Sequence, residues 1–261
     1  MQIEQLENFV KVMDLQALMH VNNAKKEANK YLTVGNELTN VIGRLLYNKN
    51  IILDKNAIKP DDTKPVLDIY IASDYGMCGA INTNIKQAIR ENEQSYKILI
   101  GKKINCSSDK LLFKIPKDDF MENFIKIEKE MVDAIAENKY SKINIFYHHY
   151  NNVSDIKFKK LQLFPIDFDS KSNLNEDFVV ETDIELLIKH LVSYYLCYEI
   201  KLCDIMSFAS ENVIRNQLTK VSLSKLETIK ENTRLAMFKK KRTKSIAKSV
   251  ENYKNSNNLN L

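Results

Sequence analysis

The stretch IASDYGMCGAINTNI, residues 71–85, determines how the middle of the chain is interpreted, because it joins an apolar run to a helix-forming run. It contains two of the five glycines in the chain, Gly76 and Gly79, and one of the four cysteines. This order is typical of a strand that turns tightly into a helix. We expect the glycines to permit the turn and Asn82 or Thr83 to cap the helix.

The loop lacks the spacing of the common phosphate-binding loops. A dinucleotide-binding loop needs G-x-G-x-x-G and an acidic residue after the next strand, whereas here two glycines are three positions apart and the next strand ends in IGKK. The P-loop motif is also missing from the sequence. An enzyme with Cys78 as nucleophile is an alternative, although no histidine lies in a motif context that would nominate it as the base.

Strand and helix patterns alternate around the loop. We expect strands at residues 66–73, 96–101, 142–150 and 160–164, and helices at 83–92 and 118–138, the second capped by Asp118. This alternation predicts a small, partly parallel, Rossmann-like α/β lobe. His148 and His149 are neighbours on one strand and should point to opposite faces, so they do not form a metal site together. The cysteines (Cys78, Cys106, Cys197 and Cys203) fit reduced structural thiols.

Both ends of the chain have the pattern of long helices. No glycine or proline follows Pro165, so residues 182–253 can form one helix of about 105 Å. Near the N-terminus, nine of twelve positions at alternating spacings of four and three are apolar; the twelve are Leu6, Val10, Met13, Ala17, His20, Ala24, Glu27, Tyr31, Gly35, Leu38, Ile42 and Leu45. Matching positions in the C-terminal segment are Leu191, Tyr195, Tyr198, Leu202, Ile205 and Ala209. We therefore expect an antiparallel coiled coil whose C-terminal helix extends beyond its partner and needs a socket.

The predicted fold class is α/β, with a long antiparallel coiled coil and a small α/β lobe. The boundaries are an N-terminal helix at 1–53, a linker at 54–65, the lobe at 66–180 and a C-terminal helix at 181–261. The sequence shows no signal-like leader and no apolar run long enough for a bilayer, which favours a cytoplasmic protein. The net charge is +5, and residues 232–250 hold seven Lys or Arg and no acidic residue, which indicates an acidic partner for the C-terminal segment.

The loop resembles the S-D-R-G-L-C-G-G-L-N-T-N segment of the gamma subunits of F-type rotary ATPases. The matching residues are Ser73, Asp74, Gly76, Cys78, Gly79, Asn82, Thr83 and Asn84. KILIGKK, with Gly101 and Lys103, is similar to the family's I-G-x-K-G, and FYHHYNN followed by LQLFPI resembles its Y-N-x-F and L-L-P. SENVIR resembles S-E-x-x-x-R, and LQALM falls where the family has I-T-K-A-M. The likeness spans nearly the whole chain and is strongest in the lobe.

This resemblance implies a central rotor shaft. The terminal helices would turn inside a hexamer of alternating catalytic and non-catalytic nucleotide-binding subunits, while the lobe meets an epsilon-like stalk subunit and a membrane ring. The chain itself would be non-catalytic and bind no cofactor, with ATP or ADP and Mg held by the partner subunits. It would lie at the inner face of the cell membrane without contacting nucleic acid. Its divergence suggests an F-type-like paralogue of wall-less bacteria with AT-rich genomes, some of which use such complexes in gliding.

The resemblance also nominates residues that contact the surrounding subunits. They are Met19, Glu211 and Arg215 on the helices. Near the C-terminus, charge attraction to acidic loops of those subunits nominates Lys239, Lys240, Lys241, Arg242, Lys244 and Lys248. The family's motif at this tip aligns in two registers, which place either Lys241 or Arg242 at its arginine. Met19 has the alternative of ordinary packing in the coiled-coil seam, and the basic residues have that of a solvated face.

A different class of function is an alternative to the rotor. A coiled-coil adaptor could bind nucleic acid or an anionic membrane through its basic C-terminus. Only Phe238 and Tyr253 lie near these charges, however, so stacking on bases has little support.

Overall fold

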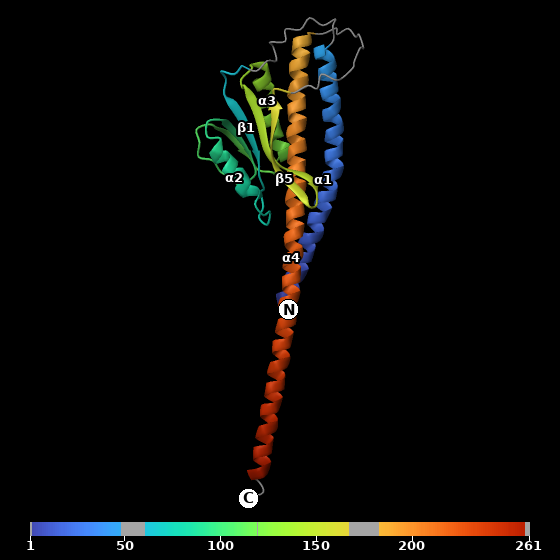
Figure 1. Ribbon diagram of the computed structural model, residues 1–261, viewed down its shortest axis with the longest axis vertical. Helices are drawn as coiled ribbons and strands as arrows, with labels where there is room; N and C mark the ends of the chain where they lie inside the picture. The colour runs from blue at the N-terminus through green and yellow to red at the C-terminus, as the bar shows by residue number, and fades with distance from the viewer. Residues whose placement is uncertain (1, 48–60, 119, 167–182, 259–261) are drawn as a thin grey trace. The chain divides into compact units, whose positions relative to one another are not determined.

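The computed structural model describes residues 2–47, 61–118, 120–166 and 183–258 (Figure 1). Contacts divide the chain into two compact units. The smaller unit combines Met1–Gln16 with Asn216–Leu261, and the larger unit is Ala17–Arg215. The predicted linker and the end of the predicted lobe fall largely outside the described residues, so the domain boundaries inferred from the sequence stay a prediction.

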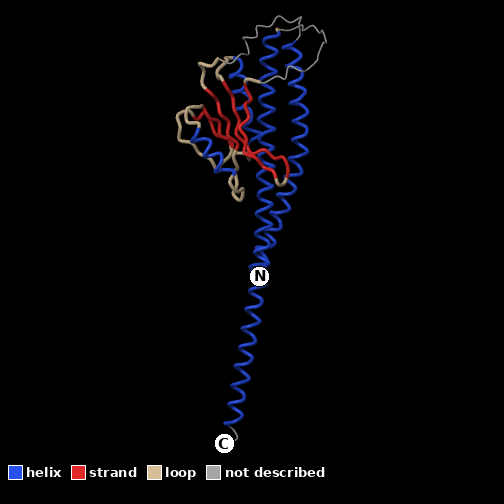
Figure 2. Tube along the Cα trace, in the orientation of Figure 1, coloured by secondary structure: helices blue, strands red, loops and turns tan. Residues whose placement is uncertain are grey.

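Five strands form one mixed sheet in the larger unit, in the order β3-β2-β1-β4-β5 (Figure 2). Their bounds are Val66–Ile71 (β1), Tyr96–Ile100 (β2), Leu111–Ile115 (β3), Lys142–Asn152 (β4) and Asp155–Phe164 (β5). β1 pairs in parallel with β2 and β4, and β2 with β3, whereas β4 and β5 are antiparallel. The partly parallel sheet is confirmed. The sequence missed β3 because this short edge strand is only half-buried and shows neither alternation nor a long apolar run.

Helices cover both faces of the sheet. They are α2 (Ile81–Glu91), α3 (Phe120–Ala136) and the first half of α4, which runs from Ile184 to Asn258. Leu67, Ile69 and Ile71 of β1 face a core shared with α3 and α4. Tyr70 and Ala72, on the opposite face of β1, pack in the core beneath α2. The alternating side-chain directions of a buried strand therefore build two apolar layers, and α4 belongs to one of them.

In the larger unit α4 packs antiparallel to α1, which spans Gln2–Tyr47. The Tyr31 ring lies 5.7 Å from that of Tyr198, and a Cβ on Gly35 would lie 3.1 Å from a carboxylate oxygen of Glu199. The predicted C-terminal seam is buried or half-buried throughout. The sequence did not predict that α4 is also buried on its sheet side, where it contributes Ile188, Val192, Leu196, Ile200 and Cys203 to the core.

The predicted seam of α1 is wrong at three positions, the first of which is Leu6, which is 49% exposed. His20 and Glu27 are exposed, whereas Val21 and Ala28, one residue further on, are buried. From Ala17 the buried positions follow the spacing four, three, four, the reverse of the predicted order. Both orders satisfy a heptad repeat, so only contact with α4 selects one of them.

In the smaller unit polar contacts fix the pairing of the two helices. Asp14 Oδ1 accepts hydrogen bonds from Asn216 Nδ2 at 2.7 Å and from Thr219 Oγ1 at 2.8 Å. Lys230 Nζ lies 3.2 Å from Glu7 Oε2. From Arg234 to Asn252 every α4 residue whose side chain is described is exposed. The prediction that the C-terminal helix extends beyond its paired zone is confirmed within this unit.

Among the described helices, none combines the length and apolar character that a membrane span requires. The described residues also contain no group of three His, Cys, Asp or Glu side chains suited to a metal ion. As predicted, His148 and His149 point to different surroundings, since His148 meets Asn84 whereas His149 meets Tyr147.

Candidate functional site

The signature turn, residues 73–82, lies where β1 ends and α2 begins, and its polar side chains bind its own backbone. Asn82 Oδ1 accepts a hydrogen bond from Ser73 N–H at 2.9 Å, and Ser73 Oγ accepts one from Tyr75 N–H at 3.1 Å. The prediction that Asn82 or Thr83 caps α2 is wrong. Ala80 is the N-cap residue and makes no side-chain cap bond, because Asn82 lies inside the helix and holds the strand end instead.

Asp74 joins the ends of three neighbouring strands. Its carboxylate accepts hydrogen bonds from the backbone N–H groups of Lys102 at 2.7 Å, Lys117 at 2.8 Å and Asp118 at 3.2 Å. Lys102 follows β2, and the other two donors follow β3. Asp118, predicted as a helix cap, has its carboxylate 2.6 Å from Lys102 Nζ and 2.8 Å from the Tyr75 hydroxyl. Asp74 thereby fixes the carboxyl edge of the parallel strands.

Only one of the two glycines in the turn needs the conformational freedom of glycine. Gly79 has a φ of +59°, in the left-handed region, whereas Gly76 has no positive φ. The second left-handed residue is Met77, with a φ of +58°. The predicted role of Gly79 is therefore confirmed. That of Gly76 is wrong, since the neighbouring methionine takes the unusual conformation.

Replacing these two glycines by alanine gives a matched test of the turn. Gly79→Ala should lower the free energy of unfolding by about 1–2 kcal/mol, because the new Cβ is held in the left-handed region and lies 3.1 Å from Ile214. Gly76→Ala should change it by less than about 0.5 kcal/mol, because no heavy atom lies within 4 Å of the added Cβ. Urea unfolding of both variants measures the difference, and equal losses would contradict this account.

Cys78 is buried in the turn, with only 4% of its surface exposed. Its thiol accepts a hydrogen bond from Asn82 Nδ2 at 3.3 Å and lies 3.7 Å from the Tyr75 carbonyl. These partners are an amide and a backbone oxygen, and neither can act as a general base. The geometry therefore favours a structural thiol over the alternative of a nucleophile.

Glu211 of α4 closes this edge of the sheet. Its Oε1 accepts a hydrogen bond from the Ser73 hydroxyl at 2.6 Å and one from Arg215 Nη2 at 2.7 Å. Arg215 also donates to the Gly76 carbonyl at 3.4 Å. In open α/β sheets this edge, outside the carboxyl ends of the strands, usually receives a ligand. Here a carboxylate of the same chain occupies it and joins α4 to the turn.

A buried lysine completes this ionic junction, which we define as Ser73, Lys117, Asp204, Glu211 and Arg215. Lys117 Nζ lies 3.3 Å from Asp204 Oδ1 and 3.7 Å from Glu211 Oε2, and its side chain is only 9% exposed. Burial opposes the charge of Lys117, but the two carboxylates raise its pKa above the ordinary value. Burial raises the pKa of Asp204, against the attraction of Lys117. A lysine held charged between two acids makes a junction that resists separation.

Sequence reasoning missed Lys117 and Asp204. Lys117 follows the unrecognised strand β3, so nothing indicated that its side chain turns inward. Asp204 is a lone acid in the apolar run LCDIM, and that pattern was the available signal for a buried, paired carboxylate.

The predicted contact residues occupy different environments. Met19 is 64% exposed, so its alternative role in seam packing is wrong. Glu211 is 2% exposed and is bonded within the chain, and the Arg215 side chain is 13% exposed. The basic residues near the C-terminus (Lys239, Lys240, Lys241, Arg242, Lys244 and Lys248) are all exposed. Contact of any of these residues with a partner subunit stays a prediction.

Comparison with known proteins agrees with the resemblance seen in the turn. The family described as ATP synthase matches residues 1–250. The ATP synthase gamma chain of Christiangramia forsetii is 26% identical over 258 residues, which cover 91% of this chain and 90% of the relative. That of Mycoplasmoides gallisepticum is 24% identical over 224 residues, covering 76% of this chain and 78% of the relative.

Solved structures share the fold. One chain of the central stalk and c-ring of Tetrahymena thermophila mitochondrial ATP synthase has a TM-score of 0.55 and 16% identity, covering 82% of this chain and 99% of that chain. A chain of Euglena gracilis mitochondrial ATP synthase has a TM-score of 0.52 and 15% identity, covering 95% and 92%. Because the family match spans nearly the whole sequence, this chain belongs to the family of ATP synthase gamma chains.

Proposed function

We propose that this chain is the central rotor shaft of an F-type-like ATPase and couples ATP hydrolysis or synthesis in a surrounding hexamer to rotation. Membership of the gamma family supports this role. The chain is a non-catalytic subunit, and ATP or ADP and Mg bind to the partner subunits. An epsilon-like stalk subunit and a membrane ring are its further partners, and the complex lies at the inner face of the cell membrane.

The observation that carries the proposal is the C-terminal end of α4. This helix is 75 residues long, and its described side chains from Arg234 onward are exposed within the smaller unit. An isolated helix gains little stability from propensity alone, so a long one without packing partners indicates a surrounding surface. The absence of glycine and proline from the helix also suits a stiff shaft.

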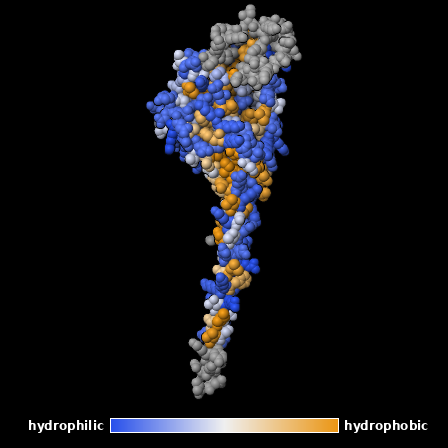
Figure 3. Space-filling view, viewed as in Figure 1, coloured by the Kyte–Doolittle hydropathy of each residue, from blue (hydrophilic) through white to orange (hydrophobic). Residues whose placement is uncertain are grey.

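The exposed end of α4 carries cations around the helix, and three of its lysines follow one side. At about 100° per residue, Leu235, Phe238, Ile246 and Val250 fall within about 120° of one another. Lys240, Lys244 and Lys248 lie on the opposite side and form the basic face, whereas Lys239 and Arg242 fall among the apolar residues. On the face drawn in Figure 3, apolar patches interrupt the hydrophilic surface of this part of α4. A socket for it would be acidic, with apolar contacts on one side.

The ionic junction suits transmission of torque from α4 to the sheet. Glu211 and Arg215 project from α4 and bond to Ser73 and to the Gly76 carbonyl in the turn. The bond from Ser73 to Glu211 is buried and that from Arg215 to Glu211 is partly buried, so both are stronger and less screened than surface pairs. A turning α4 would therefore carry the sheet with it instead of slipping past it.

Reversing the charges of the basic face should uncouple ATP hydrolysis from rotation. In the purified complex, Lys240→Glu, Lys244→Glu and Lys248→Glu together should lower rotation-linked ATP hydrolysis about tenfold, which corresponds to about 1.4 kcal/mol. The physical reason is that attraction to acidic loops of the hexamer becomes repulsion. Single-molecule rotation and steady-state hydrolysis measure the effect.

The matched control reverses the charge at three exposed lysines of the larger unit, with Lys126→Glu, Lys129→Glu and Lys142→Glu together. This variant should keep normal hydrolysis and rotation. Unchanged coupling in the variant of the basic face would contradict its role in torque. If the chain purified without nucleotide-binding subunits and bound DNA in a salt-sensitive manner, the adaptor alternative would replace the rotor.

An alternative to the complex with a membrane ring is a specialised paralogue linked to gliding machinery, which would lack a complete proton-translocating ring. The departures of the C-terminal tip from the family motif, seen in MFKKKRTKSIAKS, motivate this alternative. Identifying every chain of the native complex tests it, because a complete proton-translocating membrane ring would contradict it.

A further inference from the structure

A hollow of about 820 Å³, here called the basic trough, lies beside α2 in the larger unit. It arises from an unusual connection between β2 and β3. Parallel neighbouring strands are normally joined by a crossover of a dozen or more residues, usually a helix. Residues 101–110 join β2 to β3 without any helix. Ile104 anchors this connection in the core beneath α2, and the space that a crossover helix would fill stays open.

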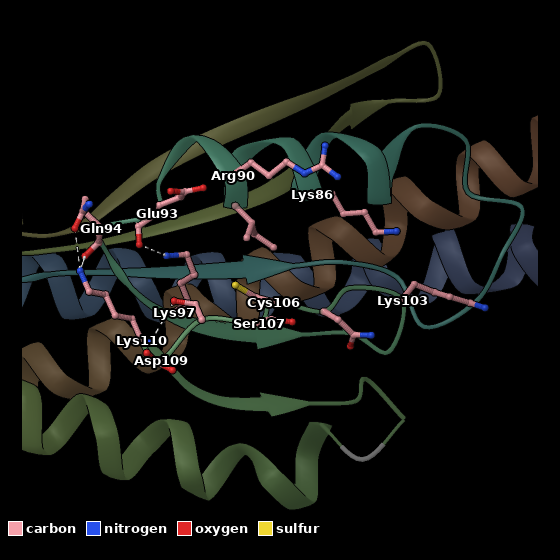
Figure 4. Close-up of a pocket in the computed structure, with 13 residues that line it drawn as sticks. Lys86, Arg90, Glu93, Gln94, Lys97, Lys103, Cys106, Ser107, Asp109 and Lys110 are labelled. Carbon is pink, nitrogen blue, oxygen red and sulfur yellow. Dashed lines mark hydrogen bonds between the residues drawn. The ribbon is translucent and has the colours of Figure 1, made fainter.

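The lining of this basic trough carries five cations and two acids. The cations are Lys86, Arg90, Lys97, Lys103 and Lys110, and the acids are Glu93 and Asp109. In Figure 4 Lys86 and Lys103 lie toward one end, and Lys97 and Lys110 toward the other. The positive charge is therefore spread along an elongated surface instead of converging on one point.

The cations at the two ends of the trough differ in their partners within the chain. Lys97 Nζ donates to the Ser95 carbonyl at 2.8 Å, and Lys110 Nζ donates to the Gln94 carbonyl at 2.8 Å. These two lysines stabilise the turn before β2. Lys86 and Arg90 are exposed and four residues apart on one side of α2, with no ion pair to another described residue. Like charges at this spacing repel each other, and an acidic ligand would relieve that repulsion.

The lining also indicates the kind of ligand. Small-molecule sites are mostly apolar with a few polar groups, but here only Ile89 and Cys106 are apolar among the thirteen lining residues. Asn105, Ser107 and Ser108 add hydrogen-bonding groups along the trough. A long polar, basic surface suits a charged chain segment better than a compact molecule.

We propose that the basic trough binds an acidic segment of a partner protein, lying along α2 in the space left by the missing crossover helix. The site shares no residue with the ionic junction. Binding of the acidic segment depends on Lys86, Arg90 and Lys103, whose charged groups form no ion pair with another described residue.

Alkylation of Cys106 offers a direct test in the full chain, because Cys106 is half-buried in the trough whereas the other three cysteines are buried. Oligoglutamate at low salt should slow maleimide labelling of Cys106, located by peptide mapping, about fivefold. Lys86→Glu with Arg90→Glu should reduce this protection to less than about twofold. Each rate is compared with that of the same variant without peptide.

The control, Lys126→Glu with Lys129→Glu, has the same change in charge on exposed positions of α3 and should keep full protection. Equal loss in the two variants, or no protection in the natural chain, would overturn the proposal. Equally strong protection by tripolyphosphate would point to a phosphate ligand and would also overturn it. In the native complex, Cys106 should react more slowly than in the isolated chain, and equal rates would count against a resident acidic segment.

Discussion

Lys117→Met should lower the free energy of unfolding by about 3–5 kcal/mol, the cost of leaving buried charges without their partner. Lys117 Nζ lies between Asp204 at 3.3 Å and Glu211 at 3.7 Å, and all three side chains are largely buried. Methionine keeps the apolar stem but removes the charge, so two carboxylates would face each other in a medium of low dielectric constant. Urea unfolding of the full chain at pH 7 measures the loss.

A double variant separates the charge effect from simple packing. Adding Asp204→Asn to Lys117→Met should recover about 1–2 kcal/mol of the loss, because one of the two stranded acids is then neutral. A packing defect would instead make the two losses additive. A loss below about 1 kcal/mol for Lys117→Met, or strict additivity, would show that the ionic junction does not hold α4 to the signature turn.

Acid should destabilise the larger unit through His148. This residue is 3% exposed, and its Nε2 lies 3.2 Å from Asn84 Nδ2, an arrangement in which the amide donates to a neutral ring. Burial, reinforced by the charge of Lys117, lowers the pKa of His148 to about 4. The folded chain therefore keeps the ring neutral at a pH where the unfolded chain, with a pKa of about 6.5, binds a proton.

The sign of the effect follows from this difference. The contribution of His148 is fully present above about pH 6.5 and is lost as the pH falls through 4, by about 3 kcal/mol in total. Burial also raises the pKa values of Glu199 and Asp204, and these acids act in the opposite direction as the pH falls. The natural chain must therefore be compared with a variant that lacks only the histidine.

His148→Gln supplies that comparison, because its side-chain oxygen can still accept from Asn84 but does not titrate. Between pH 7.5 and 4.5 the natural chain should lose more stability than this variant, and the excess should approach about 2 kcal/mol. Titration of the His148 ring by NMR gives an independent reading. A ring pKa near 6.5 in the folded chain, or parallel pH profiles, would refute the account.

The comparison of sequence and structure shows which signals were reliable. Long apolar runs located β1, β2 and β4, since each is buried on both faces and needs no partner to be recognised. The edge strand β3 went unseen because its half-buried side chains give little pattern. The seam of α1 failed at His20 and Glu27 because heptad spacing leaves two orders possible, and only the facing helix chooses between them.

The ionic junction could not be predicted for a different reason. Ser73, Lys117 and Glu211 lie far apart in the sequence, and no local pattern states that their side chains meet. Ser73 and Glu211 belong to two separate motifs of the sequence. The fold brings the Ser73 hydroxyl within 2.6 Å of the Glu211 carboxylate. Lys117 and Asp204, which belong to no motif, complete the group.

The sequence by itself determined the continuous C-terminal helix, the tight turn at Gly79 and the concentration of basic residues near the C-terminus. Each of these depends on residues within a few positions of one another, where propensity and helical spacing act. Only the tertiary structure decided the pairing register of the helices, the burial of Glu211 and the open trough beside α2. Those features arise from contacts between distant segments, and the energy of a buried charge depends on neighbours that the local sequence does not specify.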